Sequence, residues 1–131
     1  MAATYLDATY LDGLLVPAGN RIAGTLQTHG YAEIAWQPTV AWELALEATA
    51  QGTLPVDDAN SDFAAGYGLL ALRALWRHIL GPGRIELLGR VDNLADRRVV
   101  GSVIGNEGNR RFFEPAVGRT LLVSARWVQP F

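Results

Sequence analysis

The architecture of this chain can be worked out from one segment, Val91-Asp92-Asn93-Leu94-Ala95-Asp96-Arg97-Arg98-Val99-Val100-Gly101-Ser102-Val103-Ile104. It follows a run of alternating polar and apolar residues, 84–92, and precedes a second such run, 120–128. Alternation with a period of two is typical of a strand whose two faces differ. We therefore predict two strands here, separated by a long polar loop over residues 95–119.

The same alternation occurs upstream and is interrupted by turn signals. Residues 13–27 and 54–62 read as long polar loops, whereas Gln37-Pro38 and Gly81-Pro82-Gly83 read as short turns. Long and short connections thus alternate, as they do when strands run up and down and successive connections lie at opposite ends of a sheet. The predicted strands cover residues 3–12, 28–37, 39–53, 63–79, 83–94 and 119–131.

Two of these segments also fit a helix. Residues 41–51 and 69–80 are rich in Ala, Leu, Glu and Arg, which are good helix formers. The pairs Glu43/Glu47 and Arg73/Arg77 are four residues apart, a spacing that suits one helix face as well as one strand face. The pattern alone leaves helix and strand open at both places.

Composition limits the classes of protein to consider. The 131 residues are 50% apolar with a net charge of −2, which suits one domain and disfavours a general nucleic-acid binder. The absence of Cys excludes disulfides and thiolate metal sites. We find no signal peptide and no run near the ~20 apolar residues of a spanning helix. No Ser-His-Asp grouping or phosphate-binding loop supports an enzyme.

The C-terminal motifs resemble those of TonB-dependent outer-membrane receptors. In that family the penultimate strand runs into an Asn-Leu-Phe-Asp-Lys/Arg-Arg-Tyr signature, to which Val91–Ile104 is similar. Arg111–Thr120 resembles the start of the family's final strand, which ends on an aromatic residue, as Phe131 does here. The resemblance extends over nearly the whole chain and includes residues 17–22, 31–36 and 56–60.

The resemblance implies an all-β fold, an antiparallel up-and-down meander of about six strands belonging to a transmembrane β-barrel. It implies TonB-energised uptake of a ferric siderophore or similar metal chelate at the outer membrane of a Gram-negative cell. Since a closed barrel needs about eight strands, residues 1–131 are expected to be a C-terminal fragment without a plug domain, inactive alone. The implied partners are outer-membrane lipid, the rest of the barrel and plug, the TonB complex through a missing N-terminal part, and the chelate. No cofactor and no nucleic acid is implied.

The polar strand faces then become candidates for lining the barrel lumen, where we expect their charges to pair across strands. These residues are Glu43, Glu47, Arg73, Arg77, Arg84, Glu86, Arg90, Asp92 and Arg126. The four tryptophans are expected to form an aromatic girdle at the short-turn ends of the strands. They are Trp36, Trp42, Trp76 and Trp127.

The predicted outer loops contain further candidates. An anionic metal chelate could be attracted by four arginines, Arg97, Arg98, Arg110 and Arg111. Phe131 is expected to serve as the signal for barrel assembly. Asp57, Asp58 and Asp62 resemble a calcium loop but lack its Gly and distal Glu, so we expect a solvated acidic loop.

Two alternatives remain beside the receptor interpretation. The first is a small soluble β-barrel, and the second is an α+β domain built from the two helix-capable segments. Either would be a ligand-binding domain without enzymatic activity. In all three interpretations His29 and His78 are expected to have structural roles.

Overall fold

The computed structural model describes residues 1–109 and 111–129, and all its regular elements are strands. They are β1 (Ala2–Tyr5), β2 (Thr28–Thr39), β3 (Trp42–Gln51), β4 (Leu54–Pro55), β5 (Phe63–Ala64), β6 (Tyr67–Leu80), β7 (Gly83–Asp92), β8 (Val100–Val103), β9 (Phe113–Pro115) and β10 (Thr120–Val128). No helix in this described part is long and apolar enough to cross a membrane. The all-β prediction is confirmed, and the helical alternative for residues 41–51 and 69–80, with its α+β domain, is wrong.

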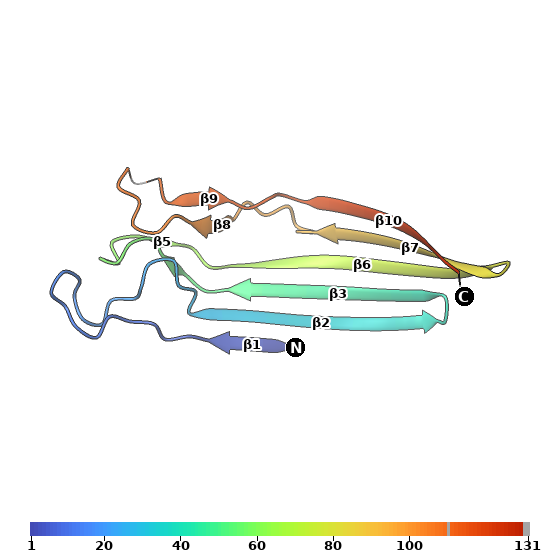
Figure 1. Cartoon of the computed structure of the whole chain (residues 1–131), viewed down its shortest axis with the longest axis horizontal. Coiled ribbons are helices and arrows are strands. Elements are labelled where there is room, and N and C mark those ends of the chain that lie inside the picture. The colour runs from blue at the N-terminus through green and yellow to red at the C-terminus, as the bar shows by residue number, and fades with distance from the viewer. Residues whose placement is uncertain (110, 130–131) are drawn as a thin grey trace. The chain divides into compact units, whose positions relative to one another are not determined.

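Six strands form one sheet in the order β1-β2-β3-β6-β7-β10, as Figure 1 shows. The pairs β1-β2, β6-β7 and β7-β10 are antiparallel, and each long strand lies beside the next long strand of the chain. This is the predicted antiparallel meander. Two small antiparallel sheets, β4-β5 and β8-β9, occupy segments that were predicted to be loops.

The contacts divide the chain into two compact units. The first consists of Met1–Tyr31, Thr49–Gly68 and Arg98–Val117, and it contains the two small sheets. Its buried side chains include Val56, which is fully buried, and Phe112. The second consists of Ala32–Ala48, Leu69–Arg97 and the described residues from Gly118 onward. Each unit therefore has its own set of stabilising contacts, described separately below.

In the second unit the strand register sorts side chains onto two faces. Leu72 lies opposite Val91, which lies opposite Leu121, and successive pairs two residues apart repeat this apolar row. The intervening positions carry the charged residues, so that Arg77 lies opposite Glu86 and Glu86 opposite Arg126, together with a few apolar residues such as Leu75 and Leu88. A pleated strand turns alternate side chains to opposite faces, so the sheet has one apolar and one charged face.

The tryptophans follow the same division. Trp42 contacts Trp76 with ring centroids 6.4 Å apart, and Trp76 and Trp127 occupy apolar-face positions in the register. Trp36 and Glu33 are three residues apart in β2, so their side chains point to opposite faces of the strand. Because the Glu33 carboxylate reaches the charged face, Trp36 belongs to the apolar face. All four lie near short turns, as expected from their positions in the sequence.

The first short turn is three residues later than predicted. The turn is formed by Val40-Ala41, and Pro38 is part of β2. Proline cannot donate a hydrogen bond and is tolerated at sheet edges. Among the described strands, β1 covers only Thr28–Tyr31 of β2, which leaves the Pro38 region at such an edge. The prediction of a short turn at Gln37-Pro38 is therefore wrong.

Two predicted strands are shorter than expected. The strand over 3–12 ends at Tyr5, because Ala8 and Tyr10 bond to Ile22 and Asn20 instead of continuing along β2. The strand over 63–79 divides into β5 and β6 at Gly66. A Cβ there would lie 2.6 Å from the Gln51 carbonyl oxygen, so only glycine allows this approach.

The remaining strands match their predictions to within a few residues. β3 is shorter than 39–53 and β2 longer than 28–37, since the turn between them has moved. β7 ends at Asp92, because Asn93 adopts a left-handed conformation with φ of 50°. β10 ends at Val128, and residues 130–131 lie outside the described residues.

The second short turn, Gly81-Pro82, has the chemistry of a tight hairpin. Leu80 pairs with Gly83, which leaves two residues in the turn. Gly81 has a φ of 57°, and a glycine at the first of two turn positions is typical of a type II′ hairpin. Gly83 lies beneath the Trp127 ring, and a Cβ added to it would overlap that ring.

We predict that Gly83→Ala destabilises the sheet by about 1–3 kcal/mol, because Trp127 must move to make room for the methyl group. Gly89→Ala is the matched control, since a Cβ at Gly89 has no atom within 4 Å. The control should leave stability unchanged or raise it slightly, as glycine weakens strand interiors. Urea unfolding in detergent measures both, and equal losses for the two variants would contradict the prediction.

Candidate functional site

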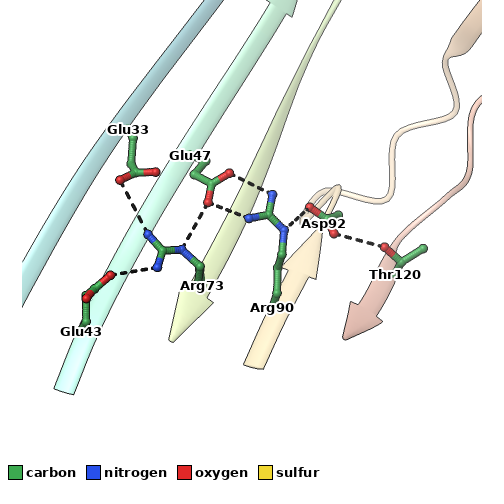
Figure 2. A network of polar contacts seen from close by, with 7 residues as sticks. All are labelled: Glu33, Glu43, Glu47, Arg73, Arg90, Asp92 and Thr120. Carbon is green, nitrogen blue, oxygen red and sulfur yellow. Dashed lines mark hydrogen bonds and ion pairs between the residues drawn. The ribbon is translucent and has the colours of Figure 1, made fainter. Parts of the chain in front are cut away.

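The charged face of the second unit is the largest cluster of ionised side chains in the described chain. Figure 2 shows its central part, in which side chains from β2, β3, β6 and β7 point toward one another. Glu and Arg recur at every second or fourth position of β3, β6 and β7, which places their charges on one face, and β2 adds Glu33. The cluster is thus built by alternation along four adjacent strands.

Arg73 on β6 is the hub of this cluster. Its guanidinium lies 2.8 Å from Glu43, 3.6 Å from Glu47 and 3.7 Å from Glu33 (Figure 2). Glu43 also accepts a hydrogen bond of 3.1 Å from Arg77. One arginine therefore bridges carboxylates from β2 and β3, which ties three neighbouring strands together.

Arg90 on β7 makes the best-formed ion pair. Two of its nitrogens donate to the two carboxylate oxygens of Glu47, at 2.7 and 2.9 Å, in the bidentate geometry that makes arginine pairs strong. Its Nε donates to Asp92 at 2.9 Å. Thr120 on β10 donates to the other oxygen of Asp92 at 3.5 Å, which extends the network to the last strand (Figure 2).

A second cluster lies nearer the Gly81-Pro82 turn. The carboxylate of Glu86, on a residue only 9% exposed, contacts Arg84 at 2.7 Å and Arg126 at 2.6 Å. Arg126 itself is two-thirds exposed, so its pair is only partly shielded from solvent. Glu86 is thus held from both sides, by its own strand and by β10.

All nine predicted lumen candidates take part in these two clusters. Seven of them form ion pairs across strands, whereas Arg84 and Asp92 form theirs within β7. Glu33 was not among the predicted residues, although it alternates with Ile34 in the sequence and that pattern could have identified it. The clusters contain five arginines and five carboxylates, so their charges balance. The residues are Arg73, Arg77, Arg84, Arg90 and Arg126 with Glu33, Glu43, Glu47, Glu86 and Asp92.

In the described part of the first unit, loops are joined by side-chain hydrogen bonds. The backbone N–H of Asp58 donates to Asn106 Oδ1 at 2.9 Å, and Asn106 Nδ2 donates back to Asp58 Oδ2 at 2.8 Å. The other Asp58 oxygen accepts from the N–H of Ala23 at 2.9 Å. Asn60 pairs with both backbone groups of Arg21 in the same reciprocal way, at 2.7 and 2.8 Å. Loop 56–62 thereby holds two segments distant in sequence.

The acidic residues of this loop accept hydrogen bonds from other groups of the protein. Asp57 accepts hydrogen bonds from both the N–H and the hydroxyl of Ser61, and the Asp58 oxygens are occupied as described above. Asp62 accepts from the N–H of Phe63. The described residues contain no group of three His, Cys, Asp or Glu side chains arranged to hold a metal ion. These carboxylates organise the loop while they remain partly or fully exposed to solvent.

The motif that opened the sequence analysis forms a clip at the end of β7. Asn93 is buried, and its side-chain amide donates to the Arg97 carbonyl and accepts from the Arg97 N–H, both at 2.9 Å. Asp96 Oδ1 accepts from the N–H of Arg119 at 2.9 Å. The N–H of Leu94 donates to the Leu70 carbonyl, so this clip joins the ends of β6, β7 and β10.

The predicted outer-loop arginines are exposed where the structure describes them. Arg97, Arg98 and Arg111 are exposed, while Arg110 lies outside the described residues. The Arg111 N–H is held by Asn109 at 2.9 Å. Phe131, the predicted assembly signal, also lies outside the described residues.

We predict that Arg90→Met lowers the free energy of unfolding by about 1–3 kcal/mol, because Glu47 and Asp92 both lose a partner on a partly buried face. Arg84→Met is the matched control. Glu86 keeps both hydrogen bonds to Arg126 in that variant, so the loss should stay below about 1 kcal/mol. The measurement is urea unfolding in detergent, followed by tryptophan fluorescence. Similar losses in both variants would contradict a special role for Arg90.

We predict that acid loosens the first unit through Asp58. The Ala23 N–H, the Asn106 amide and the Tyr10 hydroxyl hold the pKa of this carboxyl below its usual range. Stability gained from a lowered pKa is present above the unfolded value of about 4 and is lost as pH falls through the folded value. Amide protection at Ala23 and Asn106 should therefore fall on acidification, as hydrogen exchange can measure.

Variants separate this effect from general acid unfolding. Asp58→Ala should remove the protection of Ala23 at every pH, whereas Asp12→Ala, on an exposed loop, should leave it intact. Asp58→Ala should also lower the pKa of Tyr10, which its hydrogen bond to Asp58 raises above 10.0. Unchanged protection of Ala23 in Asp58→Ala would contradict the prediction.

Comparison with known structures bears on the fold. The chain is similar to the crystal structure of BauA, the ferric preacinetobactin receptor from Acinetobacter baumannii, with a TM-score of 0.69 and 13% sequence identity. The match covers 84% of this chain and 16% of the receptor chain. No model of a known protein family matches the sequence. At this identity the likeness shows the fold alone: the meander has the backbone arrangement of a segment of that receptor.

Proposed function

We propose that this chain is a segment of the wall of a TonB-dependent outer-membrane receptor that takes up a ferric siderophore or a similar metal chelate. The observation that carries the proposal is the two-faced sheet, apolar and exposed on one side and paired in charge on the other. A sheet in a membrane barrel needs this division, because one face contacts lipid and the other contacts the lumen. The similarity of fold to the ferric preacinetobactin receptor supports it.

The apolar face supports a lipid environment. Leu121 and Val123 are 72% and 73% exposed, and Ile34 is 73% exposed, although a sheet in water normally covers its apolar face. The apolar positions of β6 run from Leu70 to Leu80, a length of roughly 33 Å at about 3.3 Å per residue. At a tilt of about 40° this length rises ~25 Å, the height of the apolar band in outer-membrane barrels.

The charged face suits the inside of such a barrel. Its arginines and carboxylates neutralise one another, so in this proposal the face forms a polar, charge-balanced lining and not a trap for an anionic chelate. Chelate binding is then assigned to outer loops and to the plug of the whole receptor, with Arg97, Arg98, Arg110 and Arg111 as loop candidates. The proposal includes no catalytic step, no cofactor and no nucleic acid.

The sheet edges support a place within a larger barrel. Among the described strands, β2 is covered by β1 only over Thr28–Tyr31, and β10 has a partner only on its β7 side. Unpaired backbone groups cost several kcal/mol each in lipid. We therefore assign neighbouring strands of the receptor to these edges. The proposed location is the outer membrane of a Gram-negative cell, and the proposed energy source is the TonB complex.

We predict that the chain inserts its apolar face into a bilayer. In vesicles of phosphatidylcholine brominated on the acyl chains, tryptophan fluorescence should be strongly quenched relative to vesicles of unbrominated lipid. Trp36→Phe and Trp127→Phe should each lower the quenched signal, since both side chains are exposed on this face. A stable monomer in plain buffer with unquenched fluorescence would instead support a small soluble ligand-binding β-domain.

Uptake by cells tests the second half of the proposal. Deleting the coding sequence should lower the uptake of radioactive iron bound to a siderophore, and treating wild-type cells with a protonophore should lower it to the same level. An unchanged uptake across a panel of iron chelates would contradict a role in transport.

A further inference from the structure

His78 is an anomaly on the apolar face of the second unit. Among the described residues of β3, β6, β7 and β10, the positions on this face are otherwise occupied by aliphatic residues, tryptophan or glycine. They are Trp42, Leu44, Leu46 and Ala48, then Leu70, Leu72, Ala74, Trp76 and Leu80, then Gly83, Ile85, Leu87, Gly89 and Val91, and finally Leu121, Val123, Ala125 and Trp127. One imidazole thus interrupts an otherwise non-polar surface.

The surroundings of His78 are aromatic and uncharged. Its ring stacks on Trp76 with centroids 5.3 Å apart and an interplanar angle of 6°. In the register it lies opposite Ile85, which lies opposite Trp127. Two arginines are close to His78 in the sheet but belong to the other face: Arg77, which precedes it in sequence, and Arg84, which lies opposite Ile79. The imidazole is exposed, so its nitrogens are accessible from outside the sheet.

The position of His78 along β6 is also defined. It lies three residues before Gly81, at the end of the apolar face where Trp42, Trp76 and Trp127 gather. Tryptophan is enriched where a bilayer changes from acyl chains to headgroups. A hydrogen-bond donor at this level, on a face turned to lipid, needs an acceptor because burying it unpaired is costly. The abundant acceptor at that depth is the phosphate of a phospholipid.

We propose that the stacked pair His78–Trp76 is a binding site for the phosphate of a phospholipid headgroup. The imidazole donates a hydrogen bond to a phosphate oxygen, while the stacked indole of Trp76 holds the ring in place. This inference rests on the proposed function, since it requires the apolar face to contact a bilayer. It adds a specific lipid contact to that function.

The two histidines of the chain allow a direct test. In the His29→Gln chain, isotope-labelled histidine reports on His78 alone, and in the His78→Gln chain it reports on His29 alone. Both chains are reconstituted in vesicles of phosphatidylethanolamine and phosphatidylglycerol. Solid-state NMR should show dephasing of the His78 imidazole by lipid phosphorus. His29 should show none, because it lies opposite Thr4 on the other face of the sheet.

A binding measurement complements the spectroscopy. On phospholipid vesicles, His78→Phe should partition about five-fold more weakly than the unmodified chain, the effect of losing one hydrogen bond. On vesicles of a glycolipid without phosphate, the two chains should partition equally. Phenylalanine keeps an aromatic ring against Trp76, so the comparison isolates the donor from the stacking.

The outcomes separate this inference from the proposed function. Quenching of tryptophan by brominated acyl chains together with dephasing at His78 supports both. Quenching without dephasing, or equal partitioning of His78→Phe on phospholipid, overturns the phosphate site and leaves the membrane wall intact. Absence of quenching overturns both, because the apolar face then does not contact lipid.

Discussion

The structure of the second unit depends on keeping charged and apolar side chains on opposite faces of its strands. The constraint is strict because a slip of one residue in register turns every side chain of a strand to the other face. Arg73 and Arg90 enforce the register, since their contacts with Glu43 and Glu47 form only when β3, β6 and β7 are correctly aligned. Ion pairs here specify the alignment of strands, beyond what they add to stability.

The parts of the fold that follow from alternation were predictable from the sequence. The nine charged residues of the shared face could be assigned because each strand repeats its pattern independently of the others. The helix-forming composition of residues 41–51 and 69–80 was misleading, because pairing with neighbouring strands outweighs intrinsic propensity. The turn at Val40-Ala41 was missed because proline, the strongest local signal, is tolerated at a sheet edge.

The loop contacts of the first unit could not be predicted from the sequence. Asn60 and Asn106 act by bonding to backbone or carboxylate groups that are 39 and 48 residues away. No periodicity connects such partners, and asparagine in a polar loop predicts only a turn. The left-handed backbone conformations of Asn60 and Asn106, with φ of 55° and 57°, could likewise not be predicted from the sequence. The two units thus differ in kind: ion pairs across strands stabilise one, and amide side chains between loops stabilise the other.

The clip formed by Asn93 and Asp96 has a consequence for how such proteins diversify. Residues 98–117 lie between two anchored points, because the Arg97 N–H donates to the Asn93 side chain and the Arg119 N–H donates to the Asp96 side chain. Insertions between these anchored points do not change the register of β7 and β10. Each doubling of the length of a flexible loop raises the free energy of closing it by only about 0.6 kcal/mol. Evolution can therefore vary the length of this segment widely while the alignment of the final two strands stays fixed.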